Sequence, residues 1–353
     1  MPCTDCPLHA MSPNSGIEGA GSVPNNVMII VDMPTMSEIQ TYKIGNVNRW
    51  LGRELLNVGI DINKCYFTYA VKCYAGKLTK SDVKKCKHKL LEEIDKVKPK
   101  YILTLGSNAL YALTGKTSLK KLRGEILELD GAKVLSTYHP SSVIRTPEEL
   151  TVFRSDLYYF KRLVDNDWHP LTDFKWRVVK SKQDREDFRN AVLSSSASSY
   201  DIETTSLKDT DNGKLLLAGV ATSNEVFIFP WEHPIVKRKP ENFPRDDFNF
   251  YFANAVCTVG QNAKFDNRWL RTRGVVNPHA IFDTYLAAYT LNNTLPHGLK
   301  YLAKVELGAK SYDTGIEFTE DFPFMKLAEY CALDCYYTLK LYPILYRRLL
   351  NYE

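Results

Sequence analysis

The first half of the chain alternates between two patterns of hydrophobic and polar residues. Apolar runs rich in β-branched residues predict buried strands, and apolar residues at a spacing of three to four predict helices. The strand-like runs are residues 26–32, 65–73, 100–106 and 132–140, and the helical ones are residues 46–60, 81–97 and 107–115. Ser81 is the expected cap of the second helix. Strands that alternate with helices predict a mostly parallel sheet with helices on both faces.

A polar, proline-containing stretch at residues 164–174 separates this half from the next. We therefore expect two domains, residues 1–168 and residues 169–353. The second half begins again with a strand, a helix and a strand over residues 175–204, continues with two antiparallel strands over 215–231, and ends in helices over 282–350. The serine-rich residues 194–199 predict a loop. This pattern indicates a second α/β domain, with a mixed sheet.

The composition is that of a globular protein without a membrane span. Of the 353 residues, 44% are hydrophobic and 25% are charged, and no apolar run approaches the roughly 18 residues that cross a bilayer. The first ten residues, with Cys3, Asp5 and Cys6, lack the pattern of a signal peptide. We expect a cytoplasmic protein, in which the eight cysteines are reduced thiols or metal ligands.

Much of the basic excess lies in one stretch. The net charge of +5 arises in the first half, where six lysines lie close together: Lys77, Lys80, Lys84, Lys85, Lys87 and Lys89. A solvated helix face is the ordinary explanation of such a run. Clustered lysines also neutralise phosphates and release counterions. Binding of nucleic acid is therefore the more specific functional alternative.

Acidic residues recur in apolar surroundings in the second half. Asp201 and Glu203 lie two apart on a predicted strand, so both side chains point to one face. Asp266 opens a helix, and Tyr330 and Asp334 lie four apart on one face of another. An isolated acid pair on an exposed strand needs no function, but carboxylates among apolar residues are costly to bury without a cation. If the four acids converge, they form an oxygen site suited to Mg²⁺ or Mn²⁺.

These acids fall in three motifs: Asp201-Ile202-Glu203, Asn262 to Asp266, and Tyr330 to Asp334. In these motifs residues 171–353 resemble the DEDD-type 3′–5′ exonucleases of the tyrosine subgroup, in the form found in DNA polymerases of the polymerase I type. The segments FDTYLAAYTLN and HGLKYLAKVELG are also similar to that family. The resemblance implies an RNase H-like fold with a mixed sheet.

The resemblance also implies the chemistry. Two Mg²⁺ or Mn²⁺ ions activate a water and stabilise the leaving oxygen, and nucleoside 5′-monophosphates leave a DNA 3′ end. Asp201 is expected to bridge the ions, Glu203 and Asp334 to complete one of them, and Asp266 to support the other. Tyr330 is expected to orient the metal-bound water, because a phenol of pKa about 10 is a poor base at neutral pH. Asn262 and Phe265 are expected to position DNA and to pack.

Cys3 and Cys6 form a close pair that is half of a metal site. Cys65, Cys73 and Cys86 are the thiols of the first half that could complete it. Any four of these thiolates could hold zinc or an iron–sulfur cluster, and one close pair is less typical of zinc ribbons, which usually have two.

The segments around these cysteines resemble the family 4-like, iron–sulfur members of the uracil-DNA glycosylase superfamily, over about residues 1–165. The similar segments are CTDCPLHA, TYAVKC, CKHKLLEEIDKVKPKYILTLGSNAL, LRGEI and STYHPSSVIR. Such a domain also occurs in some phage replication polymerases. The resemblance implies a parallel-sheet α/β/α fold and a [4Fe–4S] cluster on Cys3, Cys6, Cys73 and Cys86, with Cys65 as a buried spare thiol.

The glycosylase pocket motifs of that family are altered in this chain. Asp32 stands in place of a glutamate and Tyr69 in place of the uracil-reading asparagine. The pocket phenylalanine is missing near residues 43–45, where no aromatic residue stands at the expected position. A flipped uracil needs a stacking face and paired hydrogen bonds, which His139 alone does not supply. We expect a vestigial pocket of Asp32, Tyr69 and His139. The domain would instead grip DNA through Lys84, Lys85, Lys87, Arg123, His139 and Arg145, although His139 could equally cap the loop beside Pro140.

The prediction is a 3′–5′ DNA exonuclease that proofreads for a polymerase, which would be another chain or a further C-terminal domain. Two alternatives remain open. One is a bifunctional uracil-DNA glycosylase and exonuclease in repair, and the other is a non-catalytic adaptor that senses uracil and docks a polymerase. RNA is a further candidate substrate, because RNase D-type enzymes share these carboxylates.

Overall fold

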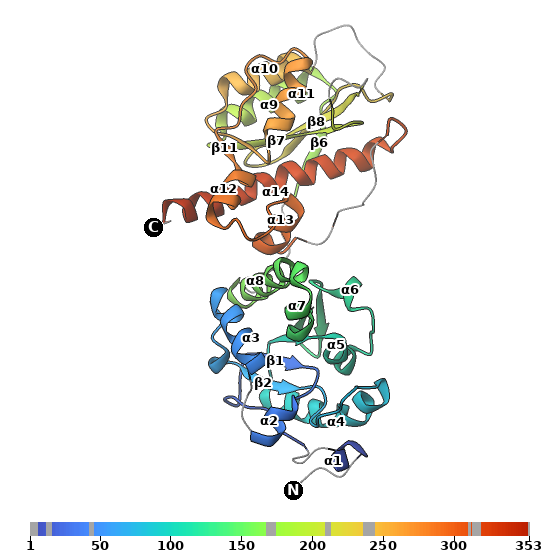
Figure 1. The fold of residues 1–353 in the computed structure, drawn as a ribbon. Helices are drawn as coiled ribbons and strands as arrows, with labels where there is room; N and C mark the ends of the chain where they lie inside the picture. Colours follow the sequence, from blue (N-terminus) through green and yellow to red (C-terminus); the bar gives the residue numbers. More distant parts are fainter. Residues whose placement is uncertain are drawn as a thin grey trace. The chain divides into compact units, whose positions relative to one another are not determined.

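The structure, a computed structural model, describes residues 6–11, 16–41, 46–166, 174–208, 213–235, 244–309, 312 and 319–351. These residues belong to two units, residues 1–167 and residues 168–353 (Figure 1). Each unit combines helices with one β-sheet, which confirms the predicted fold class. No helix among the described residues is long and apolar enough to cross a membrane.

A five-stranded sheet forms the centre of the first unit, in the order β2-β1-β3-β5-β4. Four of its strands are parallel and lie within the apolar runs: β2 (Tyr66–Tyr69), β1 (Val27–Val31), β3 (Tyr101–Leu105) and β5 (Ala132–Thr137). The edge strand β4 (Ile126–Leu129) pairs antiparallel with β5. Its residues are half-buried or exposed, and this four-residue strand was not predicted.

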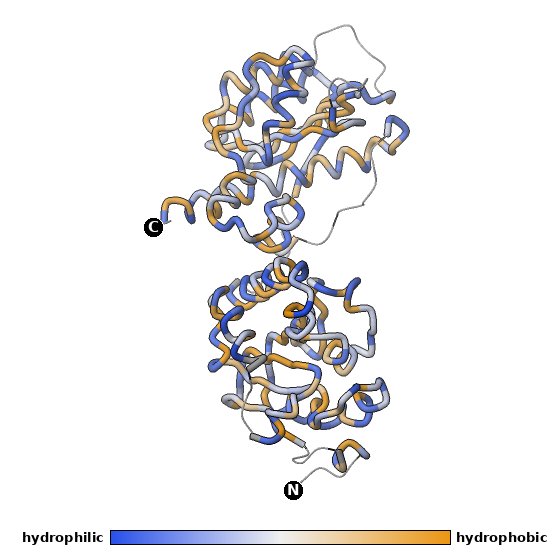
Figure 2. The backbone as a smooth tube through the Cα atoms, in the orientation of Figure 1, coloured by the Kyte–Doolittle hydropathy of each residue, from blue (hydrophilic) through white to orange (hydrophobic). Residues whose placement is uncertain are grey.

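Helices pack on this sheet in two groups. Helices α4 (Lys80–Val97) and α5 (Ser107–Thr114) share a hydrophobic cluster with Met28 and Ile30 of β1. Helices α3 (Asn46–Asn57) and α8 (Leu150–Asn166) meet through the stacked rings of Trp50 and Phe153, and α8 contacts β5. Orange and blue segments alternate along α8 in Figure 2, as expected for a helix with one buried face. The shorter elements are α1 (Leu8–Met11), α2 (Met36–Thr41), η1 (Ile62–Lys64), α6 (Leu119–Leu122), α7 (Pro140–Arg145) and η2 (Pro147–Glu149).

Helix α4 begins one residue earlier than predicted, and the expected cap at Ser81 is wrong. The N-cap is Thr79, whose hydroxyl accepts a hydrogen bond from the N–H of Asp82. The Asp82 carboxylate in turn accepts one from the N–H of Thr79 at 2.9 Å. This reciprocal capping box requires an acid three residues after the cap, and Asp82 stands at that distance from Thr79 and directly after Ser81.

A six-stranded mixed sheet forms the centre of the second unit, in the order β11-β10-β7-β8-β9-β6. Its strands are β11 (Phe282–Asp283), β10 (Thr258–Gly260), β7 (Ser198–Thr204), β8 (Leu215–Ala221), β9 (Val226–Pro230) and β6 (Trp176–Val178). Strands β7, β8 and β9 are antiparallel neighbours, and the remaining pairs are parallel. The predicted loop at residues 194–199 is shorter in the structure, because Ser194 ends a helix and Ser198 begins β7.

Helices cover both faces of the second sheet (Figure 1). Helices α9 (Lys182–Ser194), α10 (Arg245–Asn254) and α11 (Lys264–Thr272) contribute Phe188, Phe248 and Trp269 to one hydrophobic cluster. Helix α14 (Phe324–Leu350) contacts β7 and β8 and builds a different cluster with Leu217. Helices α12 (Thr284–Leu291) and α13 (Leu299–Leu307) pack against the later part of α14 around Leu341.

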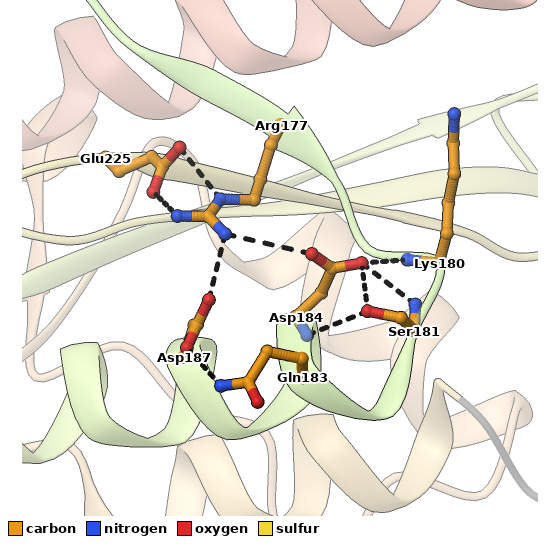
Figure 3. Close-up of polar contacts among 7 residues, drawn as sticks. All are labelled: Arg177, Lys180, Ser181, Gln183, Asp184, Asp187 and Glu225. Carbon is orange, nitrogen blue, oxygen red and sulfur yellow. Dashed lines mark hydrogen bonds and ion pairs between the residues drawn. The ribbon is translucent and has the colours of Figure 1, made fainter.

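Charged contacts secure the edge strand β6 (Figure 3). Arg177 donates two hydrogen bonds to Glu225, at 2.9 and 2.6 Å, and one to Asp187 at 3.0 Å. Ser181 and Asp184 form a capping box at the start of α9. The contacts therefore join β6 to α9 and to the residue that precedes β9.

Candidate metal centre and nucleic-acid surface

Asp201 and Glu203 project from β7 toward α14. Because they lie two apart on a strand, they share one face, and their ligand atoms and the thiol of Cys331 on α14 lie within 4.8 Å of one another. Gly219 makes this close approach possible. It pairs with Asp201 across β7 and β8, and a Cβ at Gly219 would lie 2.7 Å from the Sγ of Cys335 on α14. The glycine therefore sets the distance between the strand and the helix.

Asp334 lies one turn after Tyr330 on α14 and is buried. Its Oδ1 accepts a hydrogen bond from the Tyr312 hydroxyl at 2.8 Å and forms an ion pair with Lys300 on α13. The Lys300 ammonium also lies 3.9 Å from the ring centroid of Tyr312 and 4.0 Å from that of Tyr330. Neither Lys300 nor Tyr312 was predicted, because no spacing along the chain links them to the acidic motifs.

Asp266 reaches the same group from the first turn of α11 and is buried. The charge of Asp266 raises the pKa of Asp201, and the backbone N–H of Ile202 lowers the pKa of both acids, so the two carboxylates are neighbours. A tight turn precedes α11, in which Asn262 has a φ of 56°. This left-handed conformation is one that asparagine tolerates better than most residues.

Asp283 holds this turn in place and was not predicted as a site residue. Its carboxylate accepts hydrogen bonds from the N–H of Asn262 at 3.0 Å and of Ala263 at 2.9 Å. It also caps α12 by accepting from the N–H of Tyr285 at 2.9 Å. The sequence signal is an acid directly before an apolar helical run, which indicates the cap but not the contact with the second motif.

Glu203, Asp266 and Asp334 are buried, and Asp201 is half-buried beside them. Burial raises the pKa of Asp201 and of Glu203 well above the usual range, and neighbouring carboxylates raise both further, while Lys300 opposes the shift. Burial also raises the pKa of Asp266, to about 7. Each acid therefore resists ionisation unless a further positive charge joins the group.

The donor set fits a divalent cation. Glu203 Oε1 is buried and has no hydrogen-bond partner among the described residues. An unpaired buried polar atom is destabilising, and a cation beside it would supply the missing partner. Carboxylate oxygens are the ligands that Mg²⁺ and Mn²⁺ prefer.

The other predicted residues of the second unit lie around this group. Tyr330 is half-buried, and its ring faces the Lys300 ammonium. Asn262 is exposed. Phe265 packs beside Trp269, with ring centroids 6.3 Å apart, at the edge of a hydrophobic cluster. The structure thus brings the four acids and Tyr330 together and leaves Asn262 accessible.

In the first unit, Asp32 follows β1 and holds the start of α5. It accepts hydrogen bonds from the N–H of Asn108 at 3.1 Å, the N–H of Ala109 at 2.8 Å and the side-chain amide of Asn108 at 3.0 Å. Burial raises the pKa of Asp32, and the charge of His139 opposes this. Burial lowers the pKa of His139, and Asp32 opposes this in turn. The two predicted pocket residues are therefore close, and Asn108 is a partner that was not predicted.

The remaining pocket positions have structural contacts. His139 caps α7, because its Nδ1 accepts from the N–H of Ser141 at 3.1 Å. Tyr69 is buried in β2, with its ring edge-on to Phe67 at a centroid distance of 5.4 Å. Residues 43–45, where the pocket aromatic was found to be missing, lie outside the described residues.

Three of the four predicted cluster cysteines lie in the described part of the chain. Cys73 and Cys86 are buried in one hydrophobic cluster, and Cys6 packs against it. Cys73 Sγ accepts from the N–H of Gly16 at 3.4 Å, and Cys86 Sγ from the N–H of Lys72 at 3.3 Å. Hydrogen bonds to sulfur are a feature of iron–sulfur sites, so these thiols fit such a cluster. Cys3 lies outside the described residues.

Cys65 is buried and stands apart from this set. Its thiol donates a hydrogen bond to the carbonyl of Asp61 at 3.4 Å. Burial raises the pKa of Cys65 to about 11, and the charge of Asp61 adds to the shift. A thiol in this position stays protonated at neutral pH, in agreement with the spare role expected for it.

Most of the predicted basic residues are accessible. Lys84 and Lys85 on α4 and Arg145 on α7 are exposed, and Lys87 is half-buried. Arg123 is half-buried and forms an ion pair within the fold. Its Nη1 donates to both carboxylate oxygens of buried Asp156, at 2.7 and 2.8 Å, so its charge is neutralised within the fold.

Comparison with known proteins places the two units in two families. Residues 21–162 match the uracil DNA glycosylase superfamily, and residues 176–350 match the 3′–5′ exonuclease family. The type-4 uracil-DNA glycosylase of Thermotoga maritima is 32% identical over 151 residues, which is 40% of this chain and 78% of that protein. The chain therefore belongs to the uracil DNA glycosylase superfamily through its first domain, and its second domain is similar to the 3′–5′ exonuclease family. Both predicted resemblances are confirmed.

For two further similar proteins, the match covers a smaller share of that protein's length. The DNA polymerase of Bacillus phage SP01 is 28% identical over 155 residues, which is 42% of this chain and 17% of the polymerase. The solved catalytic core of RRP6 from Trypanosoma brucei is 22% identical with a TM-score of 0.40, and the match covers 52% of this chain and 49% of that one. The chain thus spans about half of the RRP6 core.

Proposed function

We propose that the second domain hydrolyses DNA from the 3′ end with two Mg²⁺ or Mn²⁺ ions and releases nucleoside 5′-monophosphates. The observation that carries this proposal is the group of four carboxylates in which Glu203 Oε1 is buried and has no hydrogen-bond partner in the part of the chain that the structure describes. When bound, the divalent ions would activate the attacking water and stabilise the leaving oxygen.

The residues of the site have distinct proposed roles. Asp201 is a neighbour of Glu203 and of Asp266, so it would help to hold both ions. Glu203 and Asp334 would complete the ligands of one ion, and Asp266 those of the other. Tyr330 would orient the attacking water through its hydroxyl, since a phenol is too weak a base to remove the proton itself. The exposed Asn262 and the neighbouring Phe265 would contact the terminal nucleotides.

Release of mononucleotides from 3′-labelled DNA in the presence of Mg²⁺ tests this proposal. Asp201→Ala is expected to lose roughly 10³-fold in rate, the effect of removing about 4 kcal/mol of transition-state stabilisation. Asp246→Ala is the matched control, because Asp246 is an exposed acid on α10 of the same domain. Equal activity of Asp201→Ala and wild type would exclude the site, and faster cleavage of RNA than of DNA would reassign the substrate.

We further propose that the first domain binds DNA or docks a polymerase, so that the chain serves proofreading in a family A-type replication system. The similarity to a phage DNA polymerase supports this role. The carboxylate of Asp32 is occupied by the start of α5, and Tyr69 is packed in the core, which disfavours uracil excision. Alkali-sensitive sites after incubation with uracil-containing duplex would instead establish a bifunctional repair enzyme.

The proposed DNA-binding surface of this domain consists of Lys84, Lys85, Lys87, Arg123, His139 and Arg145. Its exposed lysines lie on α4, the helix that carries Cys86 on its buried side. We propose that Cys3, Cys6, Cys73 and Cys86 hold a [4Fe–4S] cluster, which would fasten the N-terminal segment to α4. The N–H groups that point at Cys73 and Cys86 support this ligand set.

A further inference from the structure

Lys300 lies in the first turn of α13 and directs its ammonium at the proposed metal site. The ammonium forms an ion pair with Asp334, and the Lys300 side chain is 27% exposed. It also lies about equally far from two aromatic rings, 3.9 Å from the centroid of Tyr312 and 4.0 Å from that of Tyr330. Aromatic rings attract an ammonium through such cation–π contacts. The two rings and the Asp334 carboxylate therefore hold the Lys300 ammonium in one position.

The charge of Lys300 acts on more than Asp334. It opposes the upward pKa shifts of Asp201 and Glu203, which share the carboxylate group. When ionised, the four acids carry four negative charges, and the ammonium offsets one of them. Glu203 Oε1 remains without a partner among the described residues even with Lys300 in place. Lys300 is thus a partial counter-ion in a site that still attracts further positive charge.

We propose that Lys300 competes with a divalent cation for Asp334 and thereby sets the metal affinity of the exonuclease site. The inference rests on the proposed function, because it takes the four carboxylates to be metal ligands. Asp334 Oδ1 is paired with Lys300 and with the Tyr312 hydroxyl, so the ammonium must leave this oxygen before a cation can take it. The site would therefore bind metal more weakly than its four carboxylates alone would.

Titration of metal-free full-length protein with Mn²⁺, followed by calorimetry and by the electron paramagnetic resonance signal of free Mn²⁺, tests this inference. Lys300→Met is expected to bind Mn²⁺ at least about 10-fold more tightly than wild type, because the competing charge is gone. Lys300→Arg keeps the charge and should stay near wild-type affinity. Lys304→Met, one turn further along α13, is the matched control. Unchanged or weaker binding by Lys300→Met overturns the proposal.

Thermal unfolding provides a second readout. In chelator, Lys300→Met leaves the carboxylates without their counter-ion, so its midpoint should fall below that of wild type. Mn²⁺ should then raise the midpoint of Lys300→Met by more than it raises that of wild type. An equal or smaller rise contradicts the inference, and Lys300→Gln repeats the measurement with a polar side chain.

Asp201→Asn separates failure of this inference from failure of the proposed function. If wild type binds Mn²⁺, Asp201→Asn does not, and Lys300→Met binds as wild type does, the inference fails and the exonuclease proposal stands. If neither wild type nor Lys300→Met binds Mn²⁺, both are overturned.

Discussion

Asp266 shows how strongly one buried side chain depends on its surroundings. Burial raises its pKa from 3.8 to about 7. Between these two values the folded protein holds a proton that the unfolded chain has released. The free energy of unfolding of the metal-free protein therefore falls as pH rises through this window, and the loss persists above pH 7.

Asp266→Asn is therefore expected to stabilise the metal-free protein at pH 8. Asparagine resembles the protonated acid, so the advantage over wild type should shrink as pH falls toward about 5, where Asp266 is protonated anyway. Thermal midpoints in chelator at several pH values provide the measurement, and Asp246→Asn on the surface of α10 is the control. A stabilisation that is equal at pH 5 and pH 8, or larger at pH 5, would show that burial does not hold the proton on Asp266.

The packing of α14 on β7 and β8 depends on one glycine. Gly219 leaves room for the thiols of Cys331 and Cys335, and a Cβ in its place would lie 3.0 and 2.7 Å from their sulfur atoms. The same helix carries Tyr330 and Asp334. Its distance from β7 therefore decides whether Asp334 reaches the acids of the strand.

Gly219→Ala is expected to lower the free energy of unfolding by about 1–3 kcal/mol, as overpacking does in tight cores. It should also reduce exonuclease activity, because α14 moves away from β7. Gly298→Ala is the control, since no atom lies within 4 Å of a Cβ at that position. The double variant Gly219→Ala, Cys335→Ala frees space for the added methyl group and should recover part of both losses. Full activity and stability of the single variant would argue against this account of the packing.

The two units have separate hydrophobic cores. One cluster joins β1 to α4 and α5 in the first unit, and three others lie within the second. Units with their own cores can unfold separately. The two proposed metal sites also lie in different units, so each should affect one unfolding transition.

Cys86→Ser tests this separation. The variant is expected to lose iron and to lower the midpoint of the first unit, because a cluster stabilises the fold that binds it. Exonuclease activity with Mg²⁺ should be unchanged. Cys65→Ser should retain iron, because Cys65 is not a proposed ligand. Its thiol donates a hydrogen bond to the backbone carbonyl of Asp61 instead. Iron bound at the wild-type level in Cys86→Ser would contradict the ligand set.

Much of the fold and of the acidic site could be predicted from local patterns. A buried strand such as β3 needs an apolar run, and a helix such as α4 needs apolar residues at helical spacing, so these elements are visible along the chain. The acids of the exonuclease motifs can be recognised for the same reason. Asp201 and Glu203 lie two apart on a strand, and Tyr330 and Asp334 lie four apart on a helix, so each pair shares one face. The short strand β4 and the helix α8 were not predicted, and the cap of α4 is Thr79 where Ser81 was expected.

The sequence by itself therefore determined the type of many elements and the resemblance to two families, and it indicated the acids of the candidate site. Only the tertiary structure decided which distant residues meet these acids: Lys300 and Tyr312 at Asp334, Asp283 behind Asn262, and Gly219 beneath α14. It also paired Arg123 with Asp156. The physical reason is that ion pairs, burial and close packing depend on distances in space. Those distances follow from strand order and from the path of the loops, and no spacing along the chain records them.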